Sequence, residues 1–462
     1  MDKPSFTEKA VEVNTSGGGR ETLRVGIIGA GATGLPAAYD LLKAGHQAVV
    51  YERAPFIGGH ASTFDVGGER LERGYHHWFT SDTDILDLLE EIGLGHTIRW
   101  IDSTAGTLYD GQIYDFVTPF DLLKFKPLGL PDRIRLGLMT LYLQRQKDWR
   151  KYEGVTTVEW LRKYGGQRMY DTFWGPMLRG KFGEDYFDQV TMAWLWGKVN
   201  TRVKSRGKSM VREMLGYPMG SFGMVFDTLA DKIRDMGGEV HISASANRIM
   251  VEDGSVRGLE VQFGQNDPVE EPFDVVLATT PSPVFTRLVP KLPEDYQARL
   301  DSARYMSAVL IVMVLDRKLS DVYWLNVADR SIPFVGVIEH TNLIGPEHYG
   351  GKHIVYLSNY LTTDNPLYRM DQDELMQEYL PHLRKINPDF SPDWIEKVYH
   401  HRVDGAQPII GVNYSGHIPG HHTPFDGVYL ANTTQIYPED RGTNYSVRMG
   451  RQLAQMIIQD RS

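Results

Sequence analysis

The hydrophobic pattern near the start of the chain alternates between short apolar runs and an amphipathic repeat. Residues 23–28 (LRVGII) form an apolar run typical of a buried parallel strand. Apolar residues then recur at helical spacing over 35–42 and stop at Gly45, a residue type that often ends helices. A second strand is expected at 47–51. This strand–helix–strand order predicts an α/β fold.

Further along the chain, strand-like and helix-like patterns occur in blocks. Short strands are expected around Asp253 and Gly254, at 239–242, 246–250 and 256–259, and a buried strand at 274–280 is ended by Pro281. A last strand and a helix are expected at 427–431 and 445–458. Between these blocks, helical patterns occupy 83–92, 130–149, 157–164 and 188–196, and strand-like runs occupy 308–315, 323–326, 334–339 and 353–360.

Composition narrows the class of protein. The 462 residues favour two or three domains, and a net charge of −10 disfavours nucleic-acid binding. The absence of cysteine excludes disulfides and thiolate metal ligands. The longest uncharged apolar run, 307–315, is far shorter than the roughly 20 residues of a membrane span. Residues 1–22 lack the apolar core of a signal peptide and are expected to form a flexible tail, which favours a cytoplasmic protein.

The turn after the first strand carries the pattern Gly29-x-Gly31-x-x-Gly34. Gly29 permits the tight turn, Gly31 lets the backbone approach a pyrophosphate, and Gly34 allows close helix–strand packing. Glu52, 18 residues beyond Gly34, ends the second strand where a carboxylate binds an adenosine ribose. The complete context predicts a dinucleotide-binding site.

The continuation from Glu52 through Arg53 to Gly58 and Gly59 resembles the extension found in the amine oxidase, protoporphyrinogen oxidase and phytoene desaturase group of FAD enzymes. A basic residue often follows that glycine pair, whereas this chain has His60. The C-terminal strand, loop and helix are also similar, although Asn432 and Thr433 stand where many members have Gly-Asp. The resemblance implies FAD as cofactor, with the last helix directed at the flavin.

Together, the motif and the resemblance imply FAD contacts at Gly29, Gly31, Ala32, Thr33, Gly34, Glu52, Arg53, Gly58, Gly59, His60, Gly74, Tyr75, Ala246, Asn432, Thr433, Gly442, Thr443 and Asn444. The implied fold is a discontinuous Rossmann-like FAD-binding domain plus a mixed-sheet and helical substrate domain. We expect the FAD-binding domain to comprise 23–79, 213–282 and 423–462, and the substrate domain to comprise 80–212 and 283–422.

Candidate substrate-side residues fall in three segments. His76 and His77 lie in a segment that resembles the part of desaturases near the flavin, where they would move protons or orient substrate; alternatively, one is packed and the other faces water. Arg202 and Arg206 are candidate anion contacts within a tryptophan-rich and then basic stretch that also includes Lys181, and the alternative is a core beside a solvated charge run. Residues 120–135 mix basic and apolar groups, which suits either a membrane surface or an amphipathic helix packed on its own domain.

The sequence therefore favours an FAD-dependent oxidoreductase that removes hydride from a C–H bond of a small or lipid-like substrate. The electron acceptor is unknown. Two alternatives stay open: a non-redox flavin-dependent isomerase or sugar-nucleotide mutase, and a flavin-free prenyl-binding protein. The adjacent pairs His400-His401 and His421-His422 have no matching carboxylate spacing, so no metal site is expected.

Overall fold

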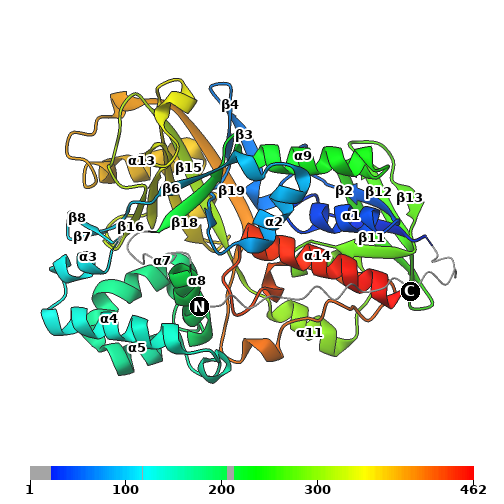
Figure 1. The fold of residues 1–462 in the computed structure, drawn as a ribbon, viewed down its shortest axis with the longest axis horizontal. Helices are drawn as coiled ribbons and strands as arrows, with labels where there is room; N and C mark the ends of the chain where they lie inside the picture. Colours follow the sequence, from blue (N-terminus) through cyan, green and yellow to red (C-terminus); the bar gives the residue numbers. More distant parts are fainter. Residues whose placement is uncertain (1–21, 117, 205–212, 462) are drawn as a thin grey trace, which may run out of the picture.

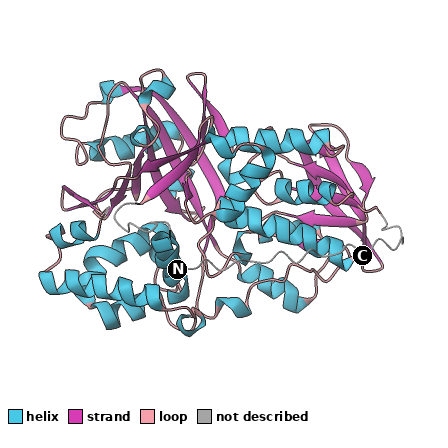
Figure 2. Ribbon diagram, viewed as in Figure 1, coloured by secondary structure: helices cyan, strands magenta, loops and turns pink. Residues whose placement is uncertain are grey.

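The computed structural model describes residues 22–116, 118–204 and 213–461. The expected α/β class is confirmed, and two sheets organise the chain (Figures 1 and 2). The expected N-terminal tail, apart from residue 22, and the candidate Arg206 lie outside the described residues.

The first sheet has five parallel strands in the order β10-β2-β1-β14-β20. Its strands are β1 (Arg24–Ile28), β2 (Gln47–Tyr51), β10 (Glu239–His241), β14 (Val275–Ala278) and β20 (Val428–Leu430). Alternate residues of each strand point to opposite faces, so Val25 and Ile27 join one apolar core and Ile28 joins another. A strand buried on both faces needs a continuous apolar run, which is the pattern of residues 23–28.

Helices cover one face of this sheet, and a small antiparallel sheet covers the other. Figure 1 shows the three helices side by side: α1 (Gly34–Lys43), α9 (Ser221–Asp235) and α14 (Thr443–Asp460). The small sheet consists of β11 (Ala244–Glu252), β12 (Ser255–Phe263) and β13 (Val269–Pro272), with α10 (Ser282–Leu288) and α11 (Glu294–Ser302) beside it. Gly450 brings α14 close to the glycine-rich turn, because a β-carbon there would lie 2.2 Å from the carbonyl oxygen of Thr33.

The second sheet has seven strands in the order β19-β15-β18-β17-β16-β7-β8. Its strands are β7 (Ala105–Tyr109), β8 (Gln112–Asp115), β15 (Tyr305–Leu315), β16 (Trp324–Val327), β17 (Gly336–Glu339), β18 (His353–Leu361) and β19 (Ile395–Pro408). All neighbours pair antiparallel except β16 and β7. One face of β15 joins the core of the first sheet, and the other packs with α13 (Gln372–Leu383) in a separate apolar cluster.

A helical layer packs beside the second sheet, at the lower left of Figure 1. It comprises α3 (Pro119–Lys124), α4 (Leu130–Arg145), α5 (Thr157–Gly165), α7 (Gly175–Tyr186) and α8 (Met192–Lys204). The helix expected at 188–196 instead begins at Met192 and continues to Lys204, because 187–189 form a turn and Val190 and Thr191 form β-bridges. Residues 80–212 are also less helical than expected, since β7 and β8 extend the large sheet.

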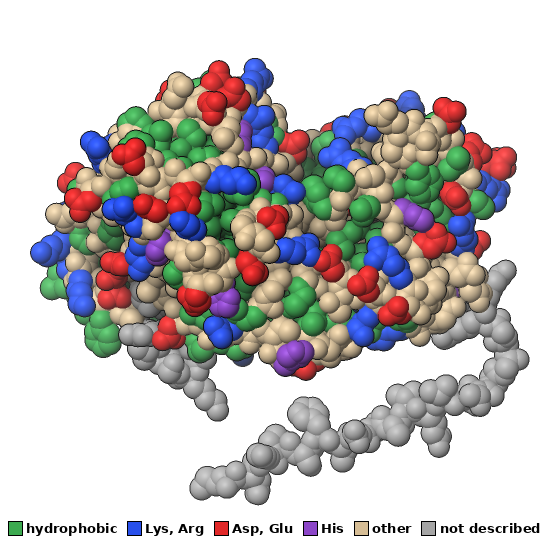
Figure 3. Space-filling view, turned by 90° about the horizontal axis from the view of Figure 1, so that it is seen from above, with side chains coloured by type: hydrophobic (Ala, Val, Ile, Leu, Met, Phe, Trp, Pro, Cys, Tyr) green, Lys and Arg blue, Asp and Glu red, His purple; other side chains and the backbone are tan. Residues whose placement is uncertain are grey.

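Shorter elements connect the two sheets. They are β3 (Thr63–Val66), β4 (Glu69–Glu72), β5 (Trp78–Phe79), α2 (Thr83–Ile92), β6 (Ile98–Asp102) and β9 (Met214–Pro218). On the face seen in Figure 3, acidic and basic side chains are interspersed rather than gathered by sign. None of the helices in the described ranges is long and apolar enough to cross a membrane.

Candidate active site

The glycine-rich turn has the geometry that its sequence predicts. Gly29 has a φ of +110°, in the region that favours glycine, and its N–H donates to the carbonyl of Tyr51 at 2.8 Å. A β-carbon on Gly34 would lie 2.0 Å from the carbonyl oxygen of Gly29, so the start of α1 packs directly on the turn. At the start of α1, Leu35 and Ala37 already donate to the carbonyls of Gly31 and Thr33, both at 3.2 Å, and residue 36 is a proline. The N–H of Gly34 is therefore the group at this helix start that is placed to contact a phosphate.

The second glycine pair lies against this turn. Gly58 donates to the carbonyl of Ala30 at 2.8 Å, and a β-carbon on Gly59 would lie 3.3 Å from the Cα of Gly31. The two glycines therefore lie in close backbone contact, which a side chain on Gly59 would crowd. Together the two segments form a surface without side chains, on which a diphosphate can lie.

Glu52 and Ala246 lie at the adenosine end of the predicted site. The Glu52 carboxylate accepts hydrogen bonds from the N–H groups of Ala30 at 3.1 Å and Ala54 at 2.8 Å, which fix it beside the turn. Its carbonyl accepts from Ala244 at the start of β11, two residues before Ala246. Arg53 is exposed next to Glu52. The strand order thus brings the two predicted nucleoside contacts together.

The N-terminus of α14 is held by two side-chain contacts. Trp78 donates to the hydroxyl of Thr443 at 2.8 Å, and the Asn444 side chain accepts from the N–H of Ile85 in α2 at 3.0 Å. Asn432 is used differently: its buried side chain caps the turn at Thr434 and donates to the carbonyl of Thr280. An amide in this place therefore stabilises the loop that follows β20, and Thr433 is half-buried beside it.

A cavity of about 220 Å³ lies between the N-terminus of α14 and the second sheet. The predicted residues that line it are His60, Gly74, Tyr75, His76, His77, Arg202, Gly442, Thr443 and Asn444. The opposite walls come from β15, β16, β18 and β19, and from α7 and α8. The remaining predicted contacts, at the glycine-rich turn and its neighbours, do not line this cavity. The predicted cofactor site is therefore extended, with only one end at the cavity.

His76 and His77 are both half-buried, and neither simply faces water. Nδ1 of His76 lies 2.5 Å from the carbonyl oxygen of Gly74, and Nδ1 of His77 lies 3.0 Å from the hydroxyl of Tyr323. Enclosure, reinforced by the charge of Arg441, lowers the pKa of His76 to about 4. Enclosure and the charge of Arg202 lower the pKa of His77 to about 3. Both imidazoles are therefore neutral near pH 7 and are weak bases, so they are better suited to hydrogen bonding than to acid catalysis.

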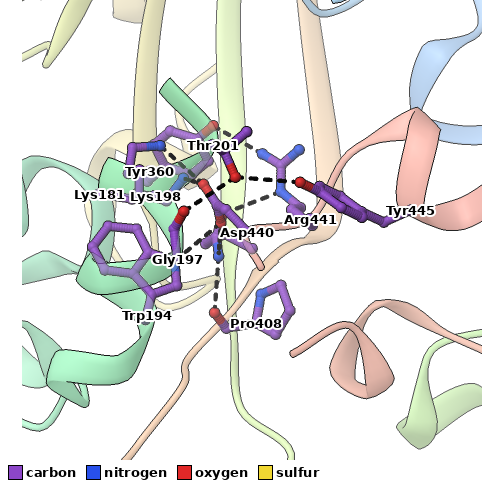
Figure 4. Close-up of polar contacts among 11 residues, drawn as sticks. Lys181, Trp194, Gly197, Lys198, Thr201, Tyr360, Pro408, Asp440, Arg441 and Tyr445 are labelled. Atoms are coloured by element: carbon purple, nitrogen blue, oxygen red, sulfur yellow. Dashed lines mark hydrogen bonds and ion pairs between the residues drawn. The ribbon is translucent and has the colours of Figure 1, made fainter. Parts of the chain in front are cut away.

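A charged cluster that the sequence did not reveal also lines the cavity (Figure 4). The Asp440 carboxylate accepts from Lys181 at 2.8 Å, Lys198 at 3.0 Å and Trp194 at 3.1 Å. Burial would raise the pKa of Asp440, but the charges of Lys181, Lys198 and Arg441 outweigh it and hold that pKa well below its usual value. Lys181 is therefore neither core nor solvated surface. Arg202 lines the same cavity and pairs with Glu213 at 3.0 Å.

Behind the cavity wall lies a buried carboxyl group. Glu72 has no exposed surface and accepts from the Tyr217 hydroxyl at 3.0 Å and from the N–H of Phe222 at 2.9 Å. Burial raises the pKa of Glu72 to about 7, although these hydrogen bonds oppose the change. Glu72 is two residues from Gly74, which lines the cavity. Among the described residues, no group of three or more acidic, histidine or cysteine side chains is placed to hold a metal ion.

The fold and this site define an FAD-dependent oxidoreductase. The family model for flavin-containing amine oxidoreductases matches residues 32–455, and the chain belongs to that family. The sequence is 24% identical to 15-cis-phytoene desaturase of Glycine max over 468 residues, covering 95% of this chain and 80% of the desaturase.

Solved structures share the fold. The crystal structure of a putative protoporphyrinogen oxidase from Exiguobacterium sp. matches with a TM-score of 0.74 at 19% identity, covering 96% of this chain and all of the other. A putrescine oxidase structure matches with a TM-score of 0.70 at 16% identity, covering 95% and 99% of the two chains. At these identities the structures support the fold alone.

Proposed function

We propose that this oxidoreductase removes hydride from a C–H bond of a small or lipid-like substrate that binds in the cavity at the N-terminus of α14. The cavity itself is the observation that carries the proposal. It connects residues expected at the flavin, Gly74 and Gly442 among them, with walls from a different sheet and helices. The desaturase relative, which is named for phytoene, supports a lipid-like substrate.

The chain's own residues would bind and orient the substrate, while bound FAD supplies the hydride acceptor. The backbone N–H groups at the start of α14 carry partial positive charge, which favours extra negative charge on a reduced cofactor. His76 and His77 would orient the substrate by hydrogen bonds. The apolar residues Ala308 and Leu310 of β15 would keep water from the reacting carbon.

The test begins with the visible absorption spectrum of the purified protein and identification of the chromophore released by heat. Candidate substrates are then mixed anaerobically with the FAD-loaded protein, and loss of the visible flavin absorption reports hydride transfer. Reoxidation by oxygen, a quinone or a nicotinamide identifies the electron acceptor. Bleaching by a C–H donor, with a dehydrogenated product, is the expected result.

Two outcomes would replace this proposal. Turnover that requires prior reduction of the flavin, with no net electron transfer, would indicate an isomerase or a sugar-nucleotide mutase. A colourless protein that fails to take up added FAD would indicate a flavin-free binding role.

We also propose that the helical layer docks on an anionic membrane surface. Helix α4 buries Leu136, Met139 and Leu143 on one face, yet it also exposes an apolar stripe on another. The exposed large apolar residues of α3 and α4 are Phe120, Leu123, Leu130, Ile134, Leu138, Leu141 and Tyr142. A helix that is apolar on two faces can bury the second face only against another apolar partner, such as a membrane. Exposed cations beside the stripe, Lys124 and Arg135, favour anionic lipid headgroups.

Sedimentation with vesicles tests this surface. The protein should bind vesicles that contain phosphatidylglycerol more strongly than vesicles of phosphatidylcholine alone. The double change Phe120→Asp and Leu138→Asp should remove most of the binding. Ile242→Asp is a matched control, because Ile242 is also exposed but lies beside β10 in the other sheet. Equal binding of all variants would refute the surface.

Finally, we propose the expected division of the chain into an FAD-binding and a substrate domain. All five parallel strands come from 23–79, 213–282 and 423–462, and all seven strands of the second sheet come from 80–212 and 283–422. These strand memberships support the proposed boundaries.

A further inference from the structure

The cavity carries more positive than negative charge around Asp440. Lys181 on α7, Lys198 on α8 and Arg441 before α14 all approach this one carboxylate or its neighbours. The side chains of Lys181 and Lys198 are 16% and 27% exposed, and that exposure is toward the cavity they line. Three cations with one carboxylate leave an excess of about two positive charges.

Arg441 shares the charge of the neighbouring Asp440 with two lysines, and its own hydrogen bonds go to neutral groups. Its Nε donates to Gln407 at 3.1 Å and its Nη2 donates to Tyr360 at 2.9 Å, and both partners are neutral groups. Within the described ranges, it forms no ion pair with a carboxylate, and no side chain accepts from its Nη1. Arg202 differs, because Glu213 compensates it. Enclosed cations are costly unless an anion joins them, so this part of the cavity favours an anionic ligand.

We propose that the substrate carries an anionic oxygen group, a carboxylate or a phosphate, that binds between Lys181, Lys198 and Arg441. The inference rests on the proposed function, because it assigns a chemical class to the ligand of the same cavity. A hydrocarbon polyene has no group that would use these cations, and a cationic amine would be repelled by them.

The cofactor's own phosphates do not account for the cluster. The diphosphate is expected between the Gly29–Gly34 turn and the Gly58–Gly59 pair, and none of these glycines lines the cavity. Burial and the charge of Lys181 lower the pKa of Lys198 to about 8. This lowering agrees with a site that holds excess positive charge. Ammonium and guanidinium groups together provide the charge-assisted hydrogen bonds that carboxylates and phosphates accept.

The experiment uses four probes that share one aromatic ring and differ in charge: benzoate, phenyl phosphate, benzyl alcohol and benzylamine. Each is titrated into the FAD-loaded protein, and perturbation of the flavin absorption spectrum gives its dissociation constant. We expect saturable binding of benzoate or phenyl phosphate at least about tenfold tighter than that of the neutral and cationic probes. The tighter of the two anions identifies the carboxylate or the phosphate as the preferred group.

Three variants test the assignment of residues. Lys198→Met should weaken binding of the anionic probes about tenfold without loss of FAD. Asp440→Asn removes the carboxylate that competes with the ligand and should tighten anion binding several-fold, a gain that a misfolded protein would not show. Lys43→Met is the control, because this substitution changes the net charge equally. Lys43 is on α1, does not line the cavity, and pairs with Glu91 of α2 at 2.8 Å.

The two proposals fail in different ways. A protein without FAD, or FAD that no C–H donor reduces, overturns the proposed function. FAD-loaded protein that binds benzyl alcohol as tightly as benzoate overturns the anionic subsite. Unchanged anion affinity in both Lys198→Met and Asp440→Asn overturns it as well. If Lys198→Met loses its FAD, Asp440→Asn alone decides the test. Tighter anion binding by Asp440→Asn supports the anionic subsite, and unchanged or weaker binding overturns it.

Discussion

Glu72→Gln should change how the stability of this protein depends on pH. Glu72 is fully buried, and burial raises the pKa of its carboxyl from 4.5 to about 7. Between these two values the folded protein keeps a proton that the unfolded chain has released. The free energy of unfolding of the wild type should therefore fall as the pH rises through this window. Below pH 4.5 both states are protonated and this loss is absent.

The pKa change sets the size of the effect. A pKa raised from 4.5 to about 7 corresponds to roughly 3 kcal/mol of stability lost above pH 7. Glutamine has nearly the same shape and is neutral at every pH, and its carbonyl oxygen can accept from the N–H of Phe222 as Glu72 does. The variant should lack this loss, so from pH 5 to pH 8 it should gain roughly 2.5 kcal/mol relative to the wild type.

Urea unfolding of FAD-loaded protein at pH 5 and pH 8 measures the difference. Glu69→Gln is the matched control, because Glu69 is exposed on the same strand, β4, and keeps its contact with water. Its unfolding free energy should follow that of the wild type. If the free energy of unfolding changes equally with pH in Glu72→Gln and in the wild type, the reasoning is refuted. That result would mean that the folded protein does not retain a proton at Glu72.

Three further changes test the cofactor and substrate positions. Gly31→Val should give soluble protein without FAD, because a β-carbon there meets only Gly59, at 3.7 Å, and added bulk enters the space between the two glycines; full FAD content would mean that the phosphates lie elsewhere. Gly34→Ala should instead lower the yield of folded protein, because its β-carbon would lie 2.0 Å from a backbone oxygen; thermal unfolding checks this. Substituting alanine at both His76 and His77 should preserve FAD content and lower turnover, and unchanged turnover would make both residues structural.

Sequence patterns predicted the elements whose structure is determined by residues close to them in the sequence. The helix expected at 83–92 is α2 with the same bounds, and the strand expected at 353–360 differs from β18 by one residue. The glycine-rich turn was also predictable, because each glycine serves a nearby backbone contact. Short strands with little apolar character, such as β7 and β8, were missed because their place depends on β16, more than 200 residues away.

The charged part of the cavity was not predictable for the same reason. Asp440 meets Lys198 across 242 positions of sequence, and neither residue stands in a motif. Lys181 stands in a basic and aromatic stretch of the sequence, where a lysine is ordinarily solvated. His76 and His77 were predictable from the resemblance of their segment to desaturases, and both line the cavity. Their hydrogen-bond partners, Gly74 and Tyr323, required the structure.

The order of strands in the parallel sheet has a consequence during protein synthesis. The central strand β1 pairs with β14, some 250 residues later, and β20 at the edge emerges only after residue 428. At about 5–20 residues per second, a ribosome needs tens of seconds between β2 and β20. Throughout that interval α1 lacks α14, the helix against which it packs in the finished fold. Cofactor loading is therefore expected to follow synthesis of β20 and α14, and chaperones would have their main opportunity to bind before it.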